Sequence, residues 1–253
     1  MEHRYHFIDT LRGITVISMI LYHMCWIMNH FGLVISDSML YGRGFLIWER
    51  SICMSFILIA GFCFSFGHHH LRTGLVLFGI GLVITFITVM FVPGIPIIFG
   101  ILTFLGSATL IMIPADMALK GMKDRSNMAG SIAFFLCIVI FIITYNINHG
   151  HMGIPYILTF TLPERLYKGY IATYIGFMDP GFYSADYFPV IPWIFLYMGG
   201  YFLHKTIRGG RIEREILVHG LPGISAIGRH SLPIYLIHPI VLYIIIYIIS
   251  IMA

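Results

Sequence analysis

The sequence predicts an all-α membrane protein, a bundle of about seven transmembrane helices. Of its 253 residues, 58% are hydrophobic and only 10% are charged, and the mean hydropathy is +0.90. A soluble domain usually has about 25% charged residues, so this chain lacks the polar side chains needed to cover a water-exposed surface. Its apolar stretches are long and lack a period of two, which excludes a β-barrel and favours helices. No long polar linker interrupts the chain, so we expect one domain over residues 1–253.

Seven stretches are long enough to cross a bilayer, which takes about 20 apolar residues in a helix. The expected spans are residues 13–31, 46–66, 74–92, 96–115, 129–147, 188–204 and 232–252. The four cysteines lie inside apolar runs without a CxxC pair. Neither a disulfide framework nor a metal site is therefore expected.

The distribution of Lys and Arg predicts the orientation of the bundle. With a cytoplasmic N-terminus, the inner side holds eleven cations: Arg4, Arg12, Arg72, Lys120, Lys123, Arg125, Lys205, Arg208, Arg211, Arg214 and Arg229. The outer side holds four: Arg43, Arg50, Arg165 and Lys168. Because cytoplasmic loops are enriched in Lys and Arg, we expect the N-terminus inside and the C-terminus outside. The inner cations then face anionic lipid headgroups, and no nucleic-acid motif is present.

Residues 148–187 form a long outer segment rich in Gly, Pro and Tyr. At about 40 residues it is too long to be a simple connection. We expect it to fold as short interfacial helices, with Tyr side chains at the level of the lipid headgroups. The segment either covers a ligand site at the outer mouth or is a passive interfacial loop.

The first span carries Arg12 at its inner end and His23 near mid-depth. Ionisable side chains inside a span are costly and are functional candidates by default. Eleven residues of helix cover about 16 Å and nearly three turns, so both side chains project from one face. A cation at the inner mouth can hold an anion, and a deeper neutral imidazole can accept a proton, which suits a long phosphate-bearing ligand. The alternatives are an ordinary positive-inside anchor for Arg12 and a core histidine for His23.

More polar residues lie on the first and last spans. His30, preceded by Asn29, lies two turns beyond His23 on the same stripe. His238 lies in the last span, with Tyr235 three residues earlier on the same face. Histidine pairs in membrane spans also ligate haem, so a haem or quinone redox protein stays an alternative.

Charges also mark the outer ends of two spans. Glu49 and Arg50 are adjacent near the start of the span at 46–66. Neighbours on a helix do not face each other, so we expect them to have different partners. Arg50 is either an interfacial snorkelling residue or a charge aimed into the bundle. Asp186 precedes the span at 188–204 and either caps that helix or orients a histidine.

Five stretches stand out, in this order along the chain: FIDTLRGITVISMILYH, WERSICMSFILIAGFCFSF, FGILTFLG, DYFPVIPWIFLYMGGYFL and GRHSLPIYLIHP. Together they resemble the small bacterial proteins related to the catalytic domain of heparan-α-glucosaminide N-acetyltransferase. The resemblance runs from residue 4 to about residue 240. The first stretch also looks like the Arg-x10-His signature of the acyltransferase-3 membrane enzymes. Two positions depart from the bacterial pattern, since Ile27 and Thr103 stand where those relatives commonly carry Asp and His.

The resemblance implies a transmembrane acyltransferase that moves an acetyl group from cytosolic acetyl-CoA to an extracytoplasmic sugar or glycan. It also implies a multi-pass protein of a bacterial plasma membrane. Heparan sulfate itself is not expected as the acceptor of so short a chain. The donor is then acetyl-CoA and no metal is expected. Membrane lipid is a further partner, and a homodimer is compatible with a small bundle although no motif demands one.

The resemblance also implies roles for single residues. Arg12 would lie near the CoA phosphates, and the donor side would also include Asp9, Tyr235 and His238. His23 occupies the position of the acyltransferase-3 histidine and would act as general base.

The second candidate for the base is His30, and direct formation of an acetyl-histidine is the less favoured variant. Asn29, Arg50 and Asp186 would lie on the acceptor side.

One alternative function stays open beside the redox protein. A membrane transporter could use the same histidines to relay protons without any chemistry on an acyl group. It predicts substrate-dependent flux and no binding of CoA.

Overall fold

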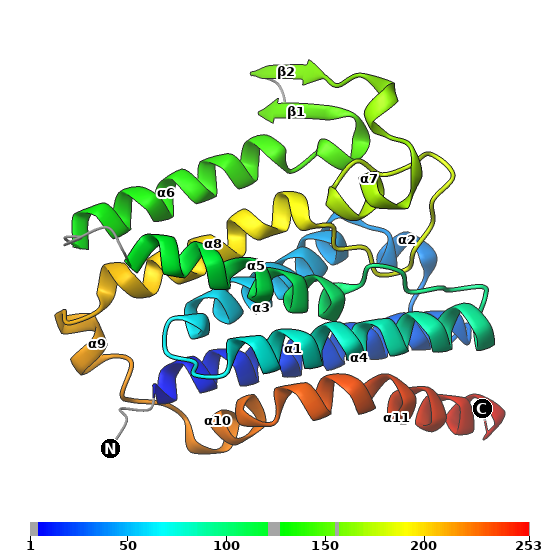
Figure 1. Ribbon diagram of the computed structural model, residues 1–253. Helices are drawn as coiled ribbons and strands as arrows, with labels where there is room; N and C mark the ends of the chain where they lie inside the picture. Colours follow the sequence, from blue (N-terminus) through cyan, green and yellow to red (C-terminus); the bar gives the residue numbers. More distant parts are fainter. Residues whose placement is uncertain (1–4, 121–126, 155–156, 253) are drawn as a thin grey trace. The chain divides into compact units, whose positions relative to one another are not determined.

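The computed structural model describes residues 5–120, 127–154 and 157–252, and in these ranges the chain is mostly helical (Figure 1). Arg4, Lys123 and Arg125 of the expected inner loops lie outside these ranges. The long helices are α1 (His6–His30), α3 (Arg43–Phe64), α4 (His70–Phe91), α5 (Ile101–Lys120), α6 (Asn127–Thr144), α8 (Val190–Ile207) and α11 (Ser231–Met252). The short elements are α2 (Asp37–Leu40), η1 (Ile147–His149), β1 (His151–Ile154), β2 (Leu158–Thr161), η2 (Glu164–Leu166), α7 (Gly169–Ile175), α9 (Arg211–Glu215) and α10 (Pro222–Arg229).

Within the described ranges, six helices are long and apolar enough to cross a membrane. These candidate spans are His6–His30, Arg43–Phe64, His70–Phe91, Ile101–Leu119, Met128–His149 and Ser231–Met252. Apolar side chains cover their outer surfaces because lipid, not water, is the expected solvent there. The chain is therefore a multi-pass membrane protein with an all-α bundle, as its composition predicts.

The remaining expected span, residues 188–204, is also helical but differs from the other six. It corresponds to α8, an 18-residue helix whose last turn carries His204 and Lys205. Most of its apolar side chains, Trp193 and Tyr201 among them, are buried. By length and apolarity together, α8 is not among the candidate spans. A C-terminus outside requires an odd number of spans, so this orientation stays a prediction.

The chain divides into two compact units, and the expected single domain stays a prediction. The first unit comprises Met1–Ile59 and Gly209–Ala253, and the second comprises Ala60–Arg208. Helix α3 contributes residues to both units.

In the first unit, α1 packs along α10 and α11 (Figure 1). Helices α1 and α11 run in the same direction, because His23 contacts His238 and Phe31, just past the end of α1, contacts Tyr243 farther along α11. The core between α1 and α3 is formed by Val16, Met19 and Ile52, with Trp48, Phe56, Ile234 and Tyr235 packed around them.

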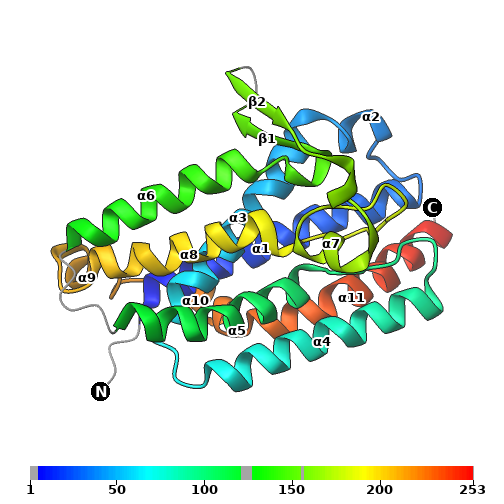
Figure 2. The ribbon, with the colours of Figure 1, turned by 45° about the horizontal axis from the view of Figure 1, so that its top comes forward.

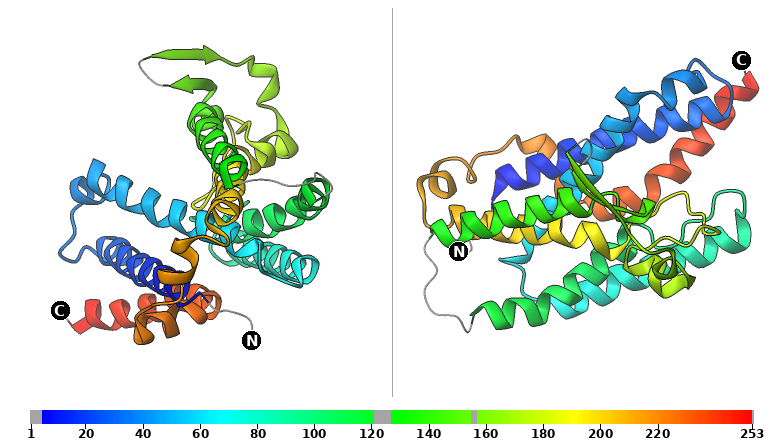
Figure 3. Two further views of the ribbon diagram at one scale, coloured as in Figure 1. Left: turned by 90° about the vertical axis from the view of Figure 1, so that its left-hand side faces the viewer. Right: turned by 90° about the horizontal axis from the view of Figure 1, so that it is seen from above.

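In the second unit, α4 packs along α5 and α6 packs along α8 (Figure 2). The outer segment begins after α6 and forms a β-hairpin, in which His151 pairs with Thr161 and Ile154 with Leu158 (Figure 3). The expectation of short helices alone for residues 148–187 was therefore incomplete, since α7 is its single α-helix in the described residues. Alternating Thr, Phe, Ile and Leu side chains favour a strand here.

Candidate functional site

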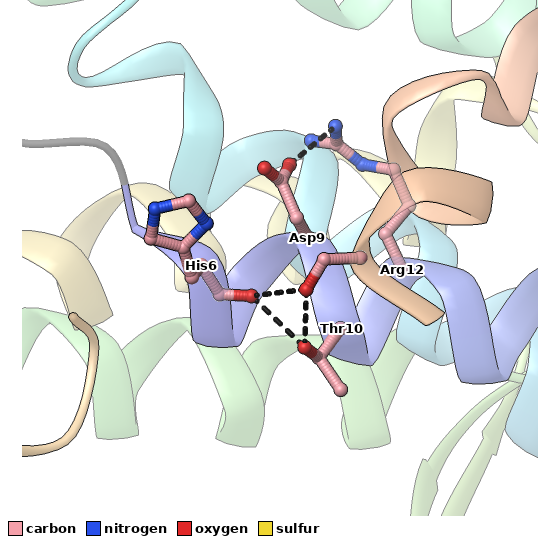
Figure 4. A network of polar contacts seen from close by, with 5 residues as sticks. His6, Asp9, Thr10 and Arg12 are labelled. Carbon is pink, nitrogen blue, oxygen red and sulfur yellow. Dashed lines mark hydrogen bonds and ion pairs between the residues drawn. The ribbon is translucent and has the colours of Figure 1, made fainter. Parts of the chain in front are cut away.

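The N-terminal end of α1 is fastened to α10 by a cluster of hydroxyl groups (Figure 4). The hydroxyls of Thr10 and Ser225 lie 2.7 Å apart. Each also lies near the carbonyl oxygen of His6, at 3.0 Å from Thr10 and 3.2 Å from Ser225. On the same turns, the guanidinium of Arg12 lies 3.8 Å from the carboxylate of Asp9 (Figure 4). Arg12 and Asp9 thus lie together, on a stretch of α1 that α10 holds in place.

Helix α10 reaches α1 closely because glycine lies at the contact. A Cβ atom on Gly228 would lie 1.9 Å from the carbonyl oxygen of Asp9, far inside van der Waals contact. The N-terminus of α10 is tied down as well, since the backbone N–H of Leu221 donates to the Thr10 hydroxyl at 3.0 Å. Without a side chain at position 228, backbone can pack against backbone.

In the C-terminal half of α1, the imidazole of His23 contacts the imidazole of His238 from α11. The ring centroids are 4.8 Å apart and the rings meet edge to face, at 64°. The ring of Tyr235 lies 5.9 Å from that of His238. The fold therefore brings His23 together with His238 and Tyr235, which are 215 and 212 positions away in the sequence. The sequence had singled out all three. The two imidazoles touch, so they leave no room between them for a porphyrin plane.

His238 is oriented by the backbone of its own helix. Its Nδ1 lies 3.1 Å from the carbonyl oxygen of Ile234 and 2.8 Å from that of Tyr235. The side chain is buried, at 7% exposed, and its Nε2 has no hydrogen-bond partner among the described residues. His23, in contrast, is only half-buried.

A second polar contact lies next to the histidine pair, on the side of α1 that faces α3. The Tyr22 hydroxyl donates to the carboxylate of Glu49 at 3.3 Å. One residue earlier on α3, the indole N–H of Trp48 donates to the Ser18 hydroxyl at 2.7 Å. Sequence reasoning missed Tyr22. The available signal was a carboxylate inside an apolar span, which requires a donor from a neighbouring helix.

His30, the second candidate for the base, and Asn29, expected on the acceptor side, lie at the C-terminal end of α1. The exposed ring of His30 stacks on Trp26, with centroids 6.0 Å apart. The Asn29 side-chain amide donates to the carbonyl of Ile35 at 3.0 Å and to the carboxylate of Asp37 at 2.8 Å. These contacts fasten the turn after α1 and do not involve the histidine pair.

Arg50, also expected on the acceptor side, is half-buried beside Glu49 on α3. The expectation that Glu49 and Arg50 have different partners stays a prediction for Arg50.

Asp186 belongs to the second unit, where it caps a helix other than the expected one. Its carboxylate accepts the backbone N–H of Ile101 at 3.0 Å, at the first residue of α5. Of the two alternatives for Asp186, a helix cap and a partner for a histidine, the structure shows a cap, although at α5. A carboxylate at a helix N-terminus satisfies an otherwise unpaired N–H and interacts favourably with the helix dipole. The fold brings this loop to α5 because Ser184 also accepts the N–H of Ile98, at 2.9 Å.

Thr103, one turn into α5, is buried at 2% exposed. Its hydroxyl oxygen has no hydrogen-bond partner among the described residues. It faces Gly81 of α4, where a Cβ atom would lie 2.3 Å from that oxygen. Threonine thus occupies a tightly packed contact between α4 and α5.

A buried acid that sequence reasoning missed lies near the other end of α5. The Tyr201 hydroxyl donates to the carboxylate of Asp116, and the ammonium of Lys205 lies 3.9 Å from it. The same ammonium lies 4.6 Å from the centre of the Tyr201 ring. These contacts neutralise Asp116 inside the second unit.

The outer segment is held together by its own backbone. The Asp179 carboxylate accepts the N–H groups of Gly169 at 2.7 Å and of Gly181 at 3.0 Å. Both bonds stabilise the ionised form, so they hold the pKa of Asp179 below its ordinary value. The Tyr187 hydroxyl donates to the carbonyl of Thr173 at 2.6 Å, and burial raises the pKa of that phenol.

One family model matches most of the chain. It is described as "Heparan-alpha-glucosaminide N-acetyltransferase, catalytic", and it matches residues 4–240. No curated protein and no solved structure matches the chain. The match includes the Arg12 end of α1, the histidine pair and the outer segment.

Proposed function

This chain belongs to the heparan-α-glucosaminide N-acetyltransferase catalytic family, a family of membrane acetyltransferases, and we propose that it transfers acetyl groups from cytosolic acetyl-CoA to an extracytoplasmic sugar or glycan. The observation that carries the proposal is the contact between His23 and His238 inside the bundle, at a centroid distance of 4.8 Å. Imidazoles are costly among apolar helices, and a neutral imidazole is suited to accept a proton from an attacking amine or hydroxyl.

The spacing between the histidine pair and Arg12 supports the choice of donor. His23 and Arg12 lie eleven residues apart on one helix, a distance of about 16 Å. CoA is a long molecule with phosphates at one end and the acetyl thioester at the other. Arg12, oriented by Asp9, is proposed to bind the phosphates, while the thioester reaches toward His23. Tyr235 and His238 complete the wall on the donor side.

The proposed reaction is a direct transfer. The nitrogen or oxygen of the acceptor attacks the thioester carbonyl, its proton passes to the imidazole of His23, and CoA leaves as the thiolate. Enzymes gain about 10²- to 10⁴-fold from such a base. Asn29 and Arg50 are proposed for the acceptor side, in a bacterial plasma membrane.

The first experiment is binding of acetyl-CoA to the purified protein in detergent, measured by calorimetry and by thermal shift. A ligand that binds only the folded state raises the midpoint of unfolding. We expect the wild type to bind, Arg12→Ala to bind about tenfold or more weakly, and His23→Ala to bind like the wild type. Arg211→Ala is the matched control, because it removes an exposed charge that pairs with Glu215 at 2.6 Å on α9.

Transfer of the acetyl group is then followed with radiolabelled acetyl-CoA and a panel of amino sugars and glycans. We expect His23→Ala to lose transfer while retaining binding. Absence of acetyl-CoA binding to the wild type at millimolar concentration would overturn the proposal. Substrate-dependent flux in proteoliposomes would then favour the transporter that uses its histidines to relay protons.

A further inference from the structure

The hydrogen bonds of His238 determine which of its ring nitrogens carries the proton. Nδ1 lies within hydrogen-bonding distance of two carbonyl oxygens, those of Ile234 and Tyr235. A carbonyl oxygen can only accept a hydrogen bond. Nδ1 must therefore carry the hydrogen, and in the neutral ring Nε2 carries the lone pair.

The residue after His238 explains why one of these carbonyls is available. In an α-helix, the carbonyl of residue 235 accepts the backbone N–H of residue 239. Residue 239 is a proline inside α11, and proline has no N–H. The Tyr235 carbonyl thus lacks its usual donor, and the His238 ring supplies one at 2.8 Å. Pro239 thus leaves a carbonyl acceptor for His238, and the hydrogen bond to it favours the Nδ1–H tautomer of His238.

In this tautomer, the hydrogen-bond acceptor on the His238 ring is Nε2. The Nε2 atom of His238 is buried and has no hydrogen-bond partner among the described residues. A buried acceptor without a donor is unfavourable. The imidazole of His23 packs edge to face on the His238 ring, at a centroid distance of 4.8 Å, and is itself half-buried. A neutral imidazole carries one ring N–H, so His23 can supply a donor for such an acceptor.

We propose that His238 is a positioning residue that sets the tautomer of His23 by accepting its ring N–H at Nε2. The other nitrogen of His23 then carries the lone pair and takes the proton of the acceptor. When it does so, His23 becomes an imidazolium whose second N–H stays donated to His238. No atom of His238 changes its covalent bonds. The catalytic part of this proposal rests on the proposed acetyl transfer, whereas the tautomers of the two rings do not.

The tautomers are read by solid-state NMR of the full chain in lipid bilayers, with ¹³C and ¹⁵N histidine and the two signals assigned by His23→Gln and His238→Gln. We expect the Nδ1–H form for His238, with a ring N–H of His23 hydrogen-bonded to a nitrogen. The Nε2–H form at His238, or a His23 ring without such a bond, would overturn the proposal. Pro239→Ala returns an N–H to the Tyr235 carbonyl, so we expect a mixture of tautomers at His238. An unchanged His238 signal in that variant would refute the role of Pro239.

Two variants of His238 separate positioning from packing. Asparagine places an amide nitrogen where Nδ1 lies, so His238→Asn keeps a donor for the carbonyls but offers His23 no acceptor. Glutamine places its amide where Nε2 lies, so His238→Gln offers an acceptor oxygen. We expect His238→Asn to lower kcat about 10²-fold or more. Both variants remove the imidazole from the donor-side wall, so any change in acetyl-CoA binding should be the same in the two. We expect His238→Gln to stay within about tenfold of the wild type.

Equal losses in the two variants, or no loss in either, would overturn the positioning role. If the wild type itself transfers no acetyl group, the proposed function fails. The NMR measurement still decides whether His238 sets the tautomer of His23.

Discussion

The contact between α10 and α1 gives a quantitative test of how the Arg12 end of the proposed site is built. In Gly228→Ala, the new Cβ atom would lie 1.9 Å from the Asp9 carbonyl oxygen and 2.9 Å from the backbone nitrogen of Gly13. A carbon normally lies about 3.3 Å or more from a carbonyl oxygen. Both atoms belong to the backbone of α1, so no side chain can rotate away. Helix α10 must therefore move by about 1.4 Å.

That movement breaks the hydroxyl cluster. The Thr10–Ser225 contact of 2.7 Å would lengthen to about 4 Å, beyond hydrogen-bonding range. The contacts of Ser225 with His6 and of Leu221 with Thr10, at 3.2 Å and 3.0 Å, would be lost in the same way. Three hydrogen bonds at about 1 kcal/mol each predict a loss of about 3 kcal/mol of stability.

The control lies on the same helix. A Cβ atom on Gly223 would meet nothing within 4 Å. Gly223→Ala should therefore be neutral or should stabilise the protein by up to about 1 kcal/mol. Thermal unfolding of both variants in one detergent is the assay, with acetyl-CoA binding as a second readout because Asp9 and Arg12 lie at the contact. Equal midpoints for Gly228→Ala and Gly223→Ala would refute the reasoning.

Three more outcomes follow from single contacts. Ser18→Ala leaves the half-buried indole N–H of Trp48 without its acceptor, so we expect thermal unfolding to show a loss of about 1 to 2 kcal/mol of stability. In a Trp48→Phe background, which has no indole N–H, Ser18→Ala should cause no further loss. Thr103→Val removes a buried hydroxyl without a described partner, so stability should stay equal or rise by about 1 kcal/mol; a drop in acetyl transfer at equal stability would show instead that the hydroxyl contacts a substrate. Hydrogen bonds lower the pKa of Asp179 in the folded state. The stability that Asp179 contributes to the outer segment is therefore complete above the ordinary carboxyl pKa, and it is lost as the pH falls through the pKa of the folded state. Limited proteolysis of the outer segment should therefore accelerate in acid for the wild type and show no such step in Asp179→Asn.

The sequence by itself determined the class of the protein and the local chemistry of its helices. Hydropathy decides whether a helix faces lipid, and six expected spans are present as long apolar helices. The tautomer of His238 is also a local property, because Ile234, Tyr235 and Pro239 belong to the same helix and lie within one turn. Arg12 and Asp9 are neighbours on α1 for the same reason.

Only the tertiary structure decided which distant groups meet. His23 and His238 lie in contact because α1 and α11 run side by side in the same direction, and apolar surfaces without a strong stripe do not specify such a neighbour. Asp186 caps α5 and not the helix that follows it, since the loop before α8 returns to an N-terminus far away in sequence. The approach of α10 to α1 depends on Gly228. The sequence shows that this residue is a glycine, but it does not show that its partner is the backbone of α1. Hydrophobicity acts without direction, so it places a helix in the membrane, while the pairing of helices follows from shape and hydrogen bonds.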